Sequence, residues 1–264
     1  MLKNKTKDLL LQGKTVVGTW LDEVRSPAIA QLLAAAGLDF LIVDMEHGPY
    51  NLETVADIVR MARQVGITPI VRVPDLTWER IGRVLDAGAQ GLMLPRVEGA
   101  AEVEAFVSYL KYPPAGRRGM ASGLGNTDFQ WVNTGDYIDF INKEILVIVQ
   151  IETKASVANL EAIAGVPGVD VLFIGPEDLS IALGLPGQQG HPKVVETIDQ
   201  IIATATRWNV KTGIPTSDSA ALPLLRDRGM RLITYGSDVE FLYLGAQQGA
   251  LALHKTSTSS SEQP

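Results

Sequence analysis

Short apolar runs recur along the chain, and each is followed by polar residues and then by a segment whose apolar positions have helical spacing. The runs are mostly continuous rather than alternating, which is typical of strands buried on both faces in a parallel sheet. There are eight of them, at residues 15–20, 40–46, 68–73, 91–96, 145–152, 171–175, 211–215 and 231–236.

The segments between the runs support the same alternation. Those at 26–37, 52–66 and 77–89 have helical spacing and carry a glycine at or near the end. Glycine most easily adopts the left-handed conformation that ends a helix. Eight strand–helix units in one chain predict a (β/α)₈ TIM barrel. An open, doubly wound sheet is the alternative fold, but no G-x-G-x-x-G motif follows the first run.

We expect a single domain over residues 1–254, because no stretch of the chain reads as an internal linker and barrels of about this length fold as one unit. The last residues, 255–264, are small and polar, and this composition predicts a disordered tail.

The net charge of the chain limits the kinds of molecule that it is expected to bind. The chain has 23 Lys and Arg against 30 Asp and Glu, a net charge of −7, without a compensating basic block. Nucleic acids and anionic membranes are therefore not expected as partners. There is no cysteine, so disulfides, thiolate nucleophiles and cysteine-based zinc sites are excluded. No signal peptide and no membrane-spanning run is visible, which predicts a cytoplasmic protein.

Polar residues stand where the apolar runs end. The run "ILVIVQIET" at 145–153 finishes on an amide and a carboxylate, although a buried charge is costly unless something pairs with it. Active sites of (β/α)₈ barrels lie at the carboxyl ends of the strands. The candidates at these ends are Trp20, Asp44, Glu46, His47, Arg72, Gln150, Glu152 and Asp178.

Several motifs resemble the HpcH/HpaI aldolase family over about residues 18–249. They are "VDMEHGP", "VRVP", "VLDAGAQGLMLP", "KYPPAGRRG", "VQIET" and "GVDVLFIGPEDLS" followed by "GHP". The resemblance implies a class II pyruvate aldolase, a metal-dependent enzyme that reversibly cleaves 4-hydroxy-2-oxo or 2-keto-3-deoxy sugar acids to pyruvate and an aldehyde.

By this resemblance, Glu152 and Asp178 would bind a divalent cation. Two carboxylates suit Mg²⁺ or Mn²⁺ and leave coordination positions for water and a 2-oxo acid. The turn from Gly175 into the next helix would hold the pyruvate carboxylate through backbone N–H groups. Pro176 has no N–H, so the donors would come from Glu177 and Asp178.

The remaining roles also follow from the resemblance. Arg72 would stabilise the enolate oxygen, and His47 would move the proton of the 4-hydroxyl. The carboxylate that orients His47 would be Asp86 of a neighbouring subunit or the local Asp44. Two further residues are expected to bind ligand or to wall the pocket, namely Gln150 and Trp20.

Other features have a structural interpretation. His191 is expected at a helix N-terminus, and residues 235–238 are expected to cap the last helix. The long segment 112–136 is rich in Gly and Pro, and long loops are often functional. Within it, residues 120–130 replace an arginine-bearing loop of relatives, which hints at a less anionic distal end of the substrate than a dicarboxylate. The apolar segment 241–253 is expected to take part in a homo-oligomer, a hexamer built as a trimer of dimers.

Three rival functions remain open. A class I aldolase would need a Schiff-base lysine in the barrel, but Lys143 and Lys211 precede their strands and Lys154 belongs to the next helix. A non-catalytic oligomeric binding protein would keep the fold without turnover. A citrate-lyase-like enzyme would bind a CoA ester, for which no basic surface is apparent.

Overall fold

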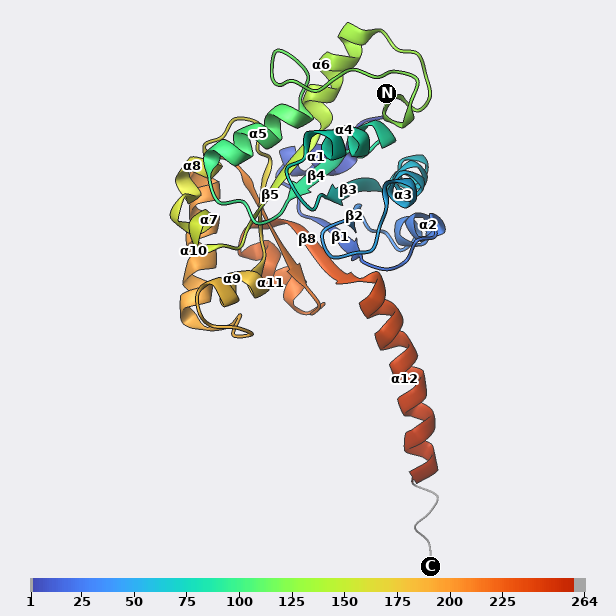
Figure 1. The fold of residues 1–264 in the computed structure, drawn as a ribbon. Helices are drawn as coiled ribbons and strands as arrows, with labels where there is room; N and C mark the ends of the chain where they lie inside the picture. The colour runs from blue at the N-terminus through green and yellow to red at the C-terminus, as the bar shows by residue number, and fades with distance from the viewer. Residues whose placement is uncertain (1, 259–264) are drawn as a thin grey trace, which may run out of the picture.

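The computed structural model describes residues 2–258, with side chains as far as residue 253, and its centre is a closed barrel of eight parallel strands in sequential order (Figure 1). The eight strands and the barrel predicted from the sequence are confirmed. The strands are β1 (Val16–Leu21), β2 (Phe40–Asp44), β3 (Thr68–Arg72), β4 (Gly91–Leu94), β5 (Leu146–Ile151), β6 (Val171–Ile174), β7 (Lys211–Thr216) and β8 (Met230–Ser237).

Helices surround the barrel, and a short 3₁₀ turn, η1 (Gly125–Thr127), lies in the long segment before β5. Gly66 and Gly88 have left-handed conformations at the ends of α3 and α4, as predicted. The helices are α1 (Lys5–Leu11), α2 (Ala28–Ala35), α3 (Leu52–Val65), α4 (Trp78–Ala87), α5 (Ala100–Leu110), α6 (Thr134–Glu144), α7 (Lys154–Ala158), α8 (Leu160–Ala164), α9 (Pro176–Ala182), α10 (Pro192–Arg207), α11 (Ala221–Asp227) and α12 (Asp238–Thr258).

Alternate residues of each strand point into the barrel and fill it. On β5, Leu146 and Ile148 belong to the interior cluster, whereas Val147 and Val149 pack outwards against the helices. Because successive side chains of a strand point to opposite faces, the next inward positions are Gln150 and residue 152. This alternation explains why the apolar run of β5 ends on polar residues. They lie above the packed interior, where the barrel opens.

The opposite end of the barrel is closed by α1. Leu10 joins the interior cluster, and Lys7 pairs with Asp170 at 2.8 Å. The long segment 112–136 and α6 lie at this end, away from α12 (Figure 1). The segment packs there against the last turns of α3 and α4, since Arg63 pairs with Asp128 at 2.8 Å. Within its own chain the segment therefore does not reach the barrel mouth, and none of residues 120–130 lines the cavity that opens there.

The chain leaves the barrel through α12, which projects away from it (Figure 1). The side chain of Ser237 accepts a hydrogen bond from the N–H of Glu240, so the predicted cap of the last helix at 235–238 is confirmed. His191 caps α10 by accepting from the N–H of Lys193, again as predicted. Helix α12 extends to Thr258, into the predicted tail, and residues 259–264 lie outside the described part of the chain.

Candidate active site

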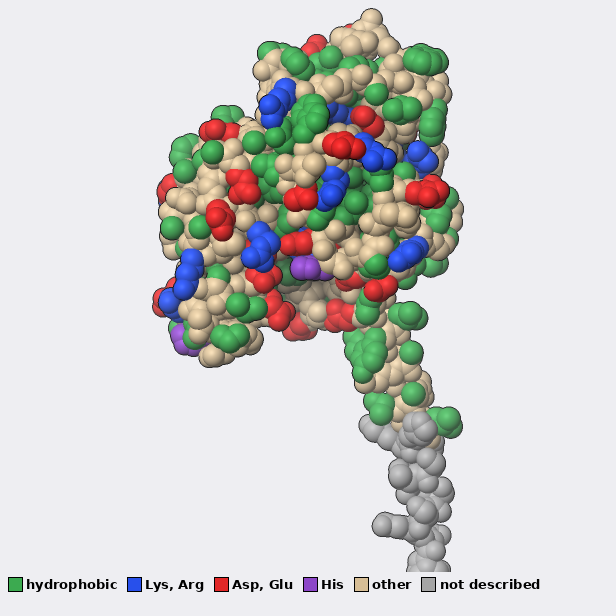
Figure 2. Space-filling model, viewed as in Figure 1, with side chains coloured by type: hydrophobic (Ala, Val, Ile, Leu, Met, Phe, Trp, Pro, Cys, Tyr) green, Lys and Arg blue, Asp and Glu red, His purple; other side chains and the backbone are tan. Residues whose placement is uncertain are grey.

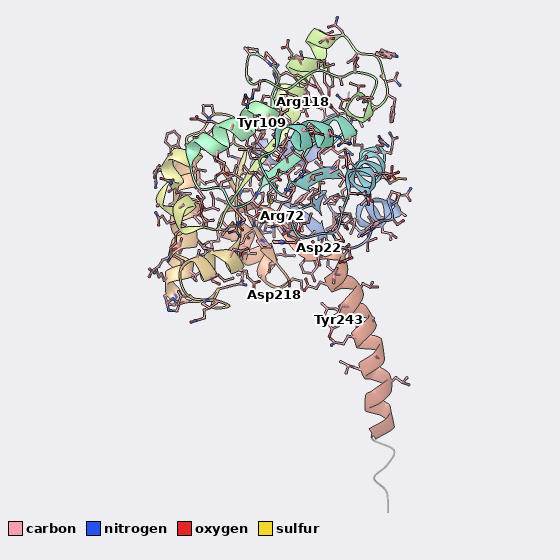
Figure 3. The ribbon with its side chains drawn as sticks, in the orientation of Figure 1. Asp22, Arg72, Tyr109, Arg118, Asp218 and Tyr243 are labelled. Atoms are coloured by element: carbon pink, nitrogen blue, oxygen red, sulfur yellow. The ribbon has the colours of Figure 1, made fainter. Side chains whose placement is uncertain are left out.

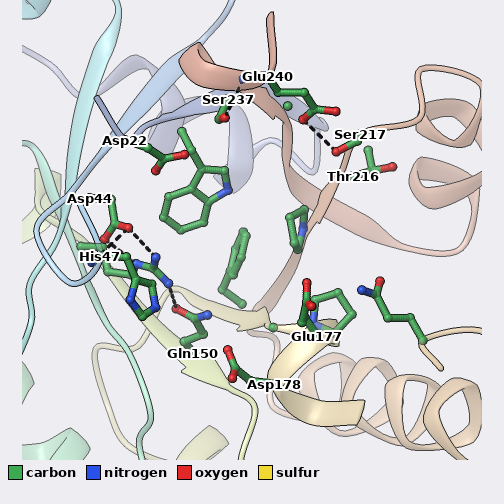
Figure 4. A pocket seen from close by; sticks show the side chains of 18 residues that line it. Asp22, Asp44, His47, Gln150, Glu177, Asp178, Thr216, Ser217, Ser237 and Glu240 are labelled. Carbon is green, nitrogen blue, oxygen red and sulfur yellow. Dashed lines mark hydrogen bonds and ion pairs between the residues drawn. The ribbon is translucent and has the colours of Figure 1, made fainter. Parts of the chain in front are cut away.

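A cavity of about 530 Å³ lies at the carboxyl ends of the strands (Figure 4). A recess bordered by acidic side chains is visible beside the base of α12 in Figure 2. Glu152 lies directly behind the cavity wall, against Gly175 and Gln150. The structure brings eight of the predicted site residues together around the cavity, namely Trp20, Asp44, His47, Arg72, Gln150, Gly175, Glu177 and Asp178.

The centre of the site is the ion pair between Arg72 and Asp44. The two residues are register partners at the ends of β3 and β2. The guanidinium donates through Nε and Nη2 to the two oxygens of Asp44, at 2.8 and 2.6 Å. Burial alone would lower the pKa of Arg72, but the hydrogen bonds and negative charge of Asp44 outweigh it and raise the pKa. The arginine is therefore a fixed, permanently charged group.

Three further contacts orient the guanidinium of Arg72. Its plane lies over the ring of Trp20, with Cζ 4.5 Å from the ring centre. Its Nη1 atom is 3.1 Å from Oε2 of Glu46 and donates to Oε1 of Gln150 at 3.4 Å. The other end of the Gln150 amide donates to Glu152 at 2.6 Å. Gln150 thereby connects the arginine to the buried carboxylate.

Glu152 is 3% exposed and is held by two hydrogen bonds. Its Oε1 accepts from the N–H of Arg96 at 2.9 Å, and its Oε2 accepts from Gln150. Burial, with repulsion from Asp178 and Glu46, raises the pKa of Glu152 to about 7, although the Arg96 hydrogen bond opposes the shift. Because its negative charge is disfavoured here, the Glu152 carboxylate is stabilised when it binds a proton or a cation.

The chain approaches Glu152 most closely at Gly175. A Cβ atom on this glycine would lie 2.3 Å from Oε2 of Glu152, so only glycine leaves room for the carboxylate. Helix α9 starts at the next residue and places Asp178 at the cavity wall, close enough to raise the pKa of Glu152 (Figure 4). The side chain of Glu177 is exposed and also lines the cavity.

The donor set suits a hard divalent cation bound by few protein ligands. Glu152 directly follows β5, and Asp178 lies in the first turn of α9. The negative charge of Asp178 repels that of Glu152, and a cation held by both carboxylates would remove that repulsion. Within the part of the chain that the structure describes, three or more His, Cys, Asp or Glu side chains nowhere form a metal-binding group. Water and substrate would therefore complete the coordination of a cation held here.

His47 lies at the rim of the cavity. Its side chain is 70% exposed, and Nε2 is 3.8 Å from Oε2 of Glu46. Asp44 accepts hydrogen bonds from the backbone N–H groups of Glu46, at 2.9 Å, and of His47, at 3.4 Å. The carboxylate of Asp44 thus holds the backbone of the loop that carries His47. The side chain that it binds is that of Arg72, not the imidazole of His47.

Asp86 is absent from the cavity wall of its own chain. It lies in the last turn of α4 and accepts a hydrogen bond from Arg118 at 3.0 Å. Arg118 lies at the closed end of the barrel, far from Asp22 and Arg72 at the mouth (Figure 3). A contact between Asp86 and His47 therefore requires a second copy of the chain.

The sequence reasoning missed one side of the cavity, which β1, β7, β8 and α12 provide. Its polar residues are Asp22, Thr216, Ser217, Ser237 and Glu240 (Figure 4). Burial, with repulsion from Asp44 and Asp238, raises the pKa of Asp22 to about 6. Asp22 could have been found, because it follows Trp20 by two residues and so continues the inward face of β1. Thr216 and Ser237 end β7 and β8, Ser217 follows β7, and Glu240 lies in the first turn of α12.

No lysine with a described side chain lines the cavity. Lys143 lies in α6, Lys154 begins α7 and Lys211 is the first residue of β7, at the closed end of the barrel. None of these three residues is placed to form a Schiff base in the cavity.

Comparisons with known proteins agree with this geometry. The family model "HpcH/HpaI aldolase/citrate lyase" matches residues 17–243. A protein of Salmonella paratyphi A named 4-hydroxy-2-oxo-heptane-1,7-dioate aldolase is 36% identical over 246 residues, which cover 93% of each chain.

Solved structures give the same result. An HpcH/HpaI aldolase from Desulfitobacterium hafniense superposes with a TM-score of 0.90 at 36% identity, covering 98% of this chain and 97% of its own. A family protein from Burkholderia cenocepacia has a TM-score of 0.88 at 35% identity, covering 95% and 99%. The chain belongs to the HpcH/HpaI aldolase/citrate lyase family and is an enzyme of the aldolase type, built as a single (β/α)₈ barrel.

Proposed function

We propose that this protein catalyses the reversible aldol cleavage of a 4-hydroxy-2-oxo acid to pyruvate and an aldehyde, with Mg²⁺ or Mn²⁺ as cofactor. The observation that carries the proposal is the connected set formed by Arg72, Gln150 and Glu152 at the barrel mouth. It places a fixed positive charge beside a buried carboxylate that favours a cation. The names of the relatives support the same chemistry.

Glu152 and Asp178 would hold the cation, because they are the carboxylates that close β5 and begin α9. When bound, a divalent cation acts as a Lewis acid that polarises the carbonyl of the 2-oxo acid. Backbone N–H groups of Glu177 and Asp178, at the start of α9, would bind the carboxylate of the pyruvate half.

Arg72 would stabilise the charge that develops on the ketone oxygen. When the C3–C4 bond breaks, its electron pair moves into the pyruvate half and gives an enolate, whose oxygen becomes negative. The guanidinium is already oriented by Asp44, Gln150 and Trp20, so the stabilisation needs no rearrangement. Trp20 also forms part of the cavity wall.

His47 would accept the proton of the 4-hydroxyl as the aldehyde carbonyl forms. The imidazole lines the cavity at its exposed rim, and its Nε2 lies 3.8 Å from Oε2 of Glu46. Histidine is the side chain most often used for proton transfer in enzymes. In the reverse direction it would return the proton to the new alkoxide. We propose that Asp86 of a partner subunit orients the imidazole, because Asp44 is occupied by Arg72.

We propose that the protein forms a homo-oligomer in which α12 packs on another copy of the chain. The proposed assembly is a hexamer built from three dimers. The helix has large apolar side chains exposed to solvent in the single chain, including Leu242 at 70% and Leu244 at 50%. None of the helices within residues 2–258 combines the length and apolar character that a membrane crossing requires. We propose that the enzyme works in the cytoplasm.

Two other functions are less well supported. A CoA-ester lyase needs cations for the nucleotide phosphates, whereas Arg72 and His47 are the only basic residues among the described residues that line the cavity. A non-catalytic binding protein would not need the bidentate orientation of Arg72 against Asp44. The aldolase explains both observations.

Turnover by metal-depleted protein tests the proposal. Pyruvate and a small aldehyde should give aldol product when Mg²⁺ or Mn²⁺ is added, and a chelator should stop the reaction. The Glu152→Gln variant should lose activity and metal binding, whereas Glu104→Gln, an exposed site on α5, should keep both. Product formation in the presence of chelator, or a covalent adduct trapped by borohydride and pyruvate, would contradict the metal-dependent mechanism.

A further inference from the structure

The indole of Trp20 contacts Arg72, the residue proposed to stabilise the enolate oxygen. The guanidinium lies over the indole, with Cζ 4.5 Å from the ring centre. The ring of Phe173 approaches the same indole in a T-shaped arrangement, with the ring centres 5.8 Å apart. One face of the guanidinium is therefore covered by an aromatic ring, and the orientation of that ring decides how well it covers the charge.

The nitrogen of this indole has a buried partner on another strand. Nε1 of Trp20 donates to Oγ1 of Thr234 on β8 at 2.8 Å. Thr234 is fully buried and does not itself line the cavity. The preceding inward residue of β8, Leu232, belongs to the apolar interior cluster. A hydroxyl in such surroundings costs free energy unless it is hydrogen-bonded, so the contact with Trp20 explains how threonine is accommodated at this position.

The pairing of β1 with β8 allows the indole to reach this hydroxyl. The register partner of Thr234 is Gly18, and the register then shifts, so that Trp20 pairs with Ser237. Gly18 and Trp20 point to the same face of β1, because they are two residues apart. A Cβ atom on Gly18 would lie 2.4 Å from the carbonyl oxygen of Phe40, so this position carries no side chain. The indole two residues further along β1 can therefore lie against Thr234.

Other groups hold the backbone around Trp20. The hydroxyl of Thr19 donates to the carbonyl oxygen of Gly236 at 3.0 Å. The carboxylate of Asp238 accepts hydrogen bonds from the backbone N–H groups of residues 22, 23 and 24, at 2.9, 3.1 and 2.7 Å. Removal of the Thr234 hydroxyl should therefore leave the main chain of this region in place and release only the indole.

We propose that Thr234 is a positioning residue for the aldol reaction, because its hydroxyl fixes the indole of Trp20 and the indole fixes the guanidinium of Arg72. The inference rests on the proposed aldol function and adds to it a residue that lies outside the cavity wall. Arg72 would stabilise a charge that develops only as the enolate forms, and a preorganised donor of this kind acts mainly on the transition state. Loss of the Thr234 hydroxyl should therefore lower kcat more than it changes KM.

Steady-state aldol addition of pyruvate to propanal by the full-length enzyme with Mn²⁺ tests the inference. Thr234→Val keeps the shape of the side chain without its hydroxyl, and kcat should fall about three- to tenfold, the effect of one lost hydrogen bond, while KM for pyruvate changes less than about twofold. Thr234→Ser keeps the hydroxyl and should restore kcat to within about twofold of the wild type. The control Thr206→Val removes an exposed hydroxyl on α10 that donates to Ile202, and it should leave kcat unchanged.

The Trp20→Phe variant shows whether the hydroxyl acts through the indole. Phenylalanine supplies an aromatic ring beside Arg72 but has no N–H to donate to Thr234. In this background Thr234→Val should lower kcat further by less than about twofold, because the hydrogen bond is already absent. A second readout does not depend on activity. The ¹H–¹⁵N signal of the Trp20 indole, assigned by its loss in Trp20→Phe, should shift in Thr234→Val and keep its wild-type position in Thr206→Val.

Four results would overturn the inference. They are a loss of kcat below about threefold in Thr234→Val, an equal loss in Thr234→Ser, an undiminished loss in the Trp20→Phe background, and an indole signal that does not move in Thr234→Val. Each of them would leave the aldol function intact. Failure of the wild-type enzyme to form aldol product in the presence of metal would instead overturn the proposed function, and the role of Thr234 with it.

Discussion

Arg72 is the residue on which the proposed chemistry depends most directly. Its charge is fixed by Asp44, and its plane is fixed by Trp20 and Gln150. A lysine has one point of charge and cannot make the forked contact with both oxygens of Asp44. The register pairing of residues 44 and 72 makes the forked contact possible, since it places the two side chains on neighbouring strands at the same height.

Arg72→Lys should therefore lower kcat for aldol cleavage by about 10²–10³-fold, the usual effect of losing one preorganised donor to a developing oxyanion. Steady-state kinetics with saturating Mn²⁺ measure it. The control is Arg80→Lys, because Arg80 makes an exposed ion pair with Asp75 on the surface. A kcat for Arg72→Lys within tenfold of the wild type would contradict the proposed role.

Asp22 should make stability depend on pH in a definite direction. Its pKa is raised by burial from 3.8 to about 6, so the folded state holds the proton more tightly than the unfolded state. Its contribution to stability is fully present below about pH 4 and is lost as the pH rises through about 6. Asp22→Asn removes the loss, because an amide does not ionise.

The Tm of Asp22→Asn minus the Tm of the wild type should therefore increase as the pH rises from 4.5 to 7. Thermal unfolding in chelator at several pH values measures this difference. The same comparison with Asp139→Asn, at an exposed position on α6, should show no such trend. A constant difference for Asp22→Asn would show that burial does not disfavour the ionised form.

At the scale of the elements, the site depends on how β5 and β6 end. The inward-pointing residues at the end of β5 are Ile148 and Gln150, and Glu152 is the next inward position. Gly175, directly after β6, lies against the carboxylate of Glu152. The φ of Gly175 is −96°, which any residue can adopt. The glycine is needed for space, because a side chain would occupy the volume of the Glu152 carboxylate.

Gly175→Ala should lower the affinity for Mn²⁺ by about tenfold or more, since the methyl group would displace the carboxylate proposed to bind the metal. Isothermal titration of metal-free protein measures the affinity. Gly82→Ala is the matched control, because a Cβ at Gly82 in α4 has no neighbour within 4 Å. It should keep the affinity and should stabilise the helix by about 0.5–1 kcal/mol. Equal affinities in both variants would contradict the role of Gly175.

At the scale of the whole molecule, the barrel forms a cavity within one chain, but two features have no role in the single chain. Helix α12 projects from the barrel with its apolar side chains exposed, and Asp86 lies far from the cavity of its own chain. Several large apolar side chains exposed together on one helix usually mark an interface. Both features are explained if several copies assemble.

A charge placed on the apolar positions of α12 should therefore dissociate the assembly. We expect Leu242→Glu with Leu244→Glu to reduce the mass in solution towards that of a single chain, as measured by light scattering after size-exclusion chromatography. The control Gln248→Glu adds a charge at a polar position of the same helix and should not change the mass. A wild-type protein that is already monomeric would contradict the assembly.

The sequence by itself determined the barrel. Continuous apolar runs separated by helical segments allow few arrangements of the chain. The polar residues at the ends of the runs, Arg72, Gln150 and Glu152, indicated the end of the barrel where the cavity lies. These features are local, because a strand's side chains alternate wherever the strand lies. The family motifs lie at the strand ends and are also local, so the sequence alone was enough to recognise them.

Only the tertiary structure decided which partners these side chains have. It paired Asp44 with Arg72 rather than with the His47 ring, and it placed Asp86 and the segment 112–136 at the closed end of the barrel. It also brought Asp22, Ser217 and Glu240 together on one side of the cavity. Such contacts depend on the closure of the barrel and on strand register, which bring together residues that are far apart in the chain and carry no shared local pattern.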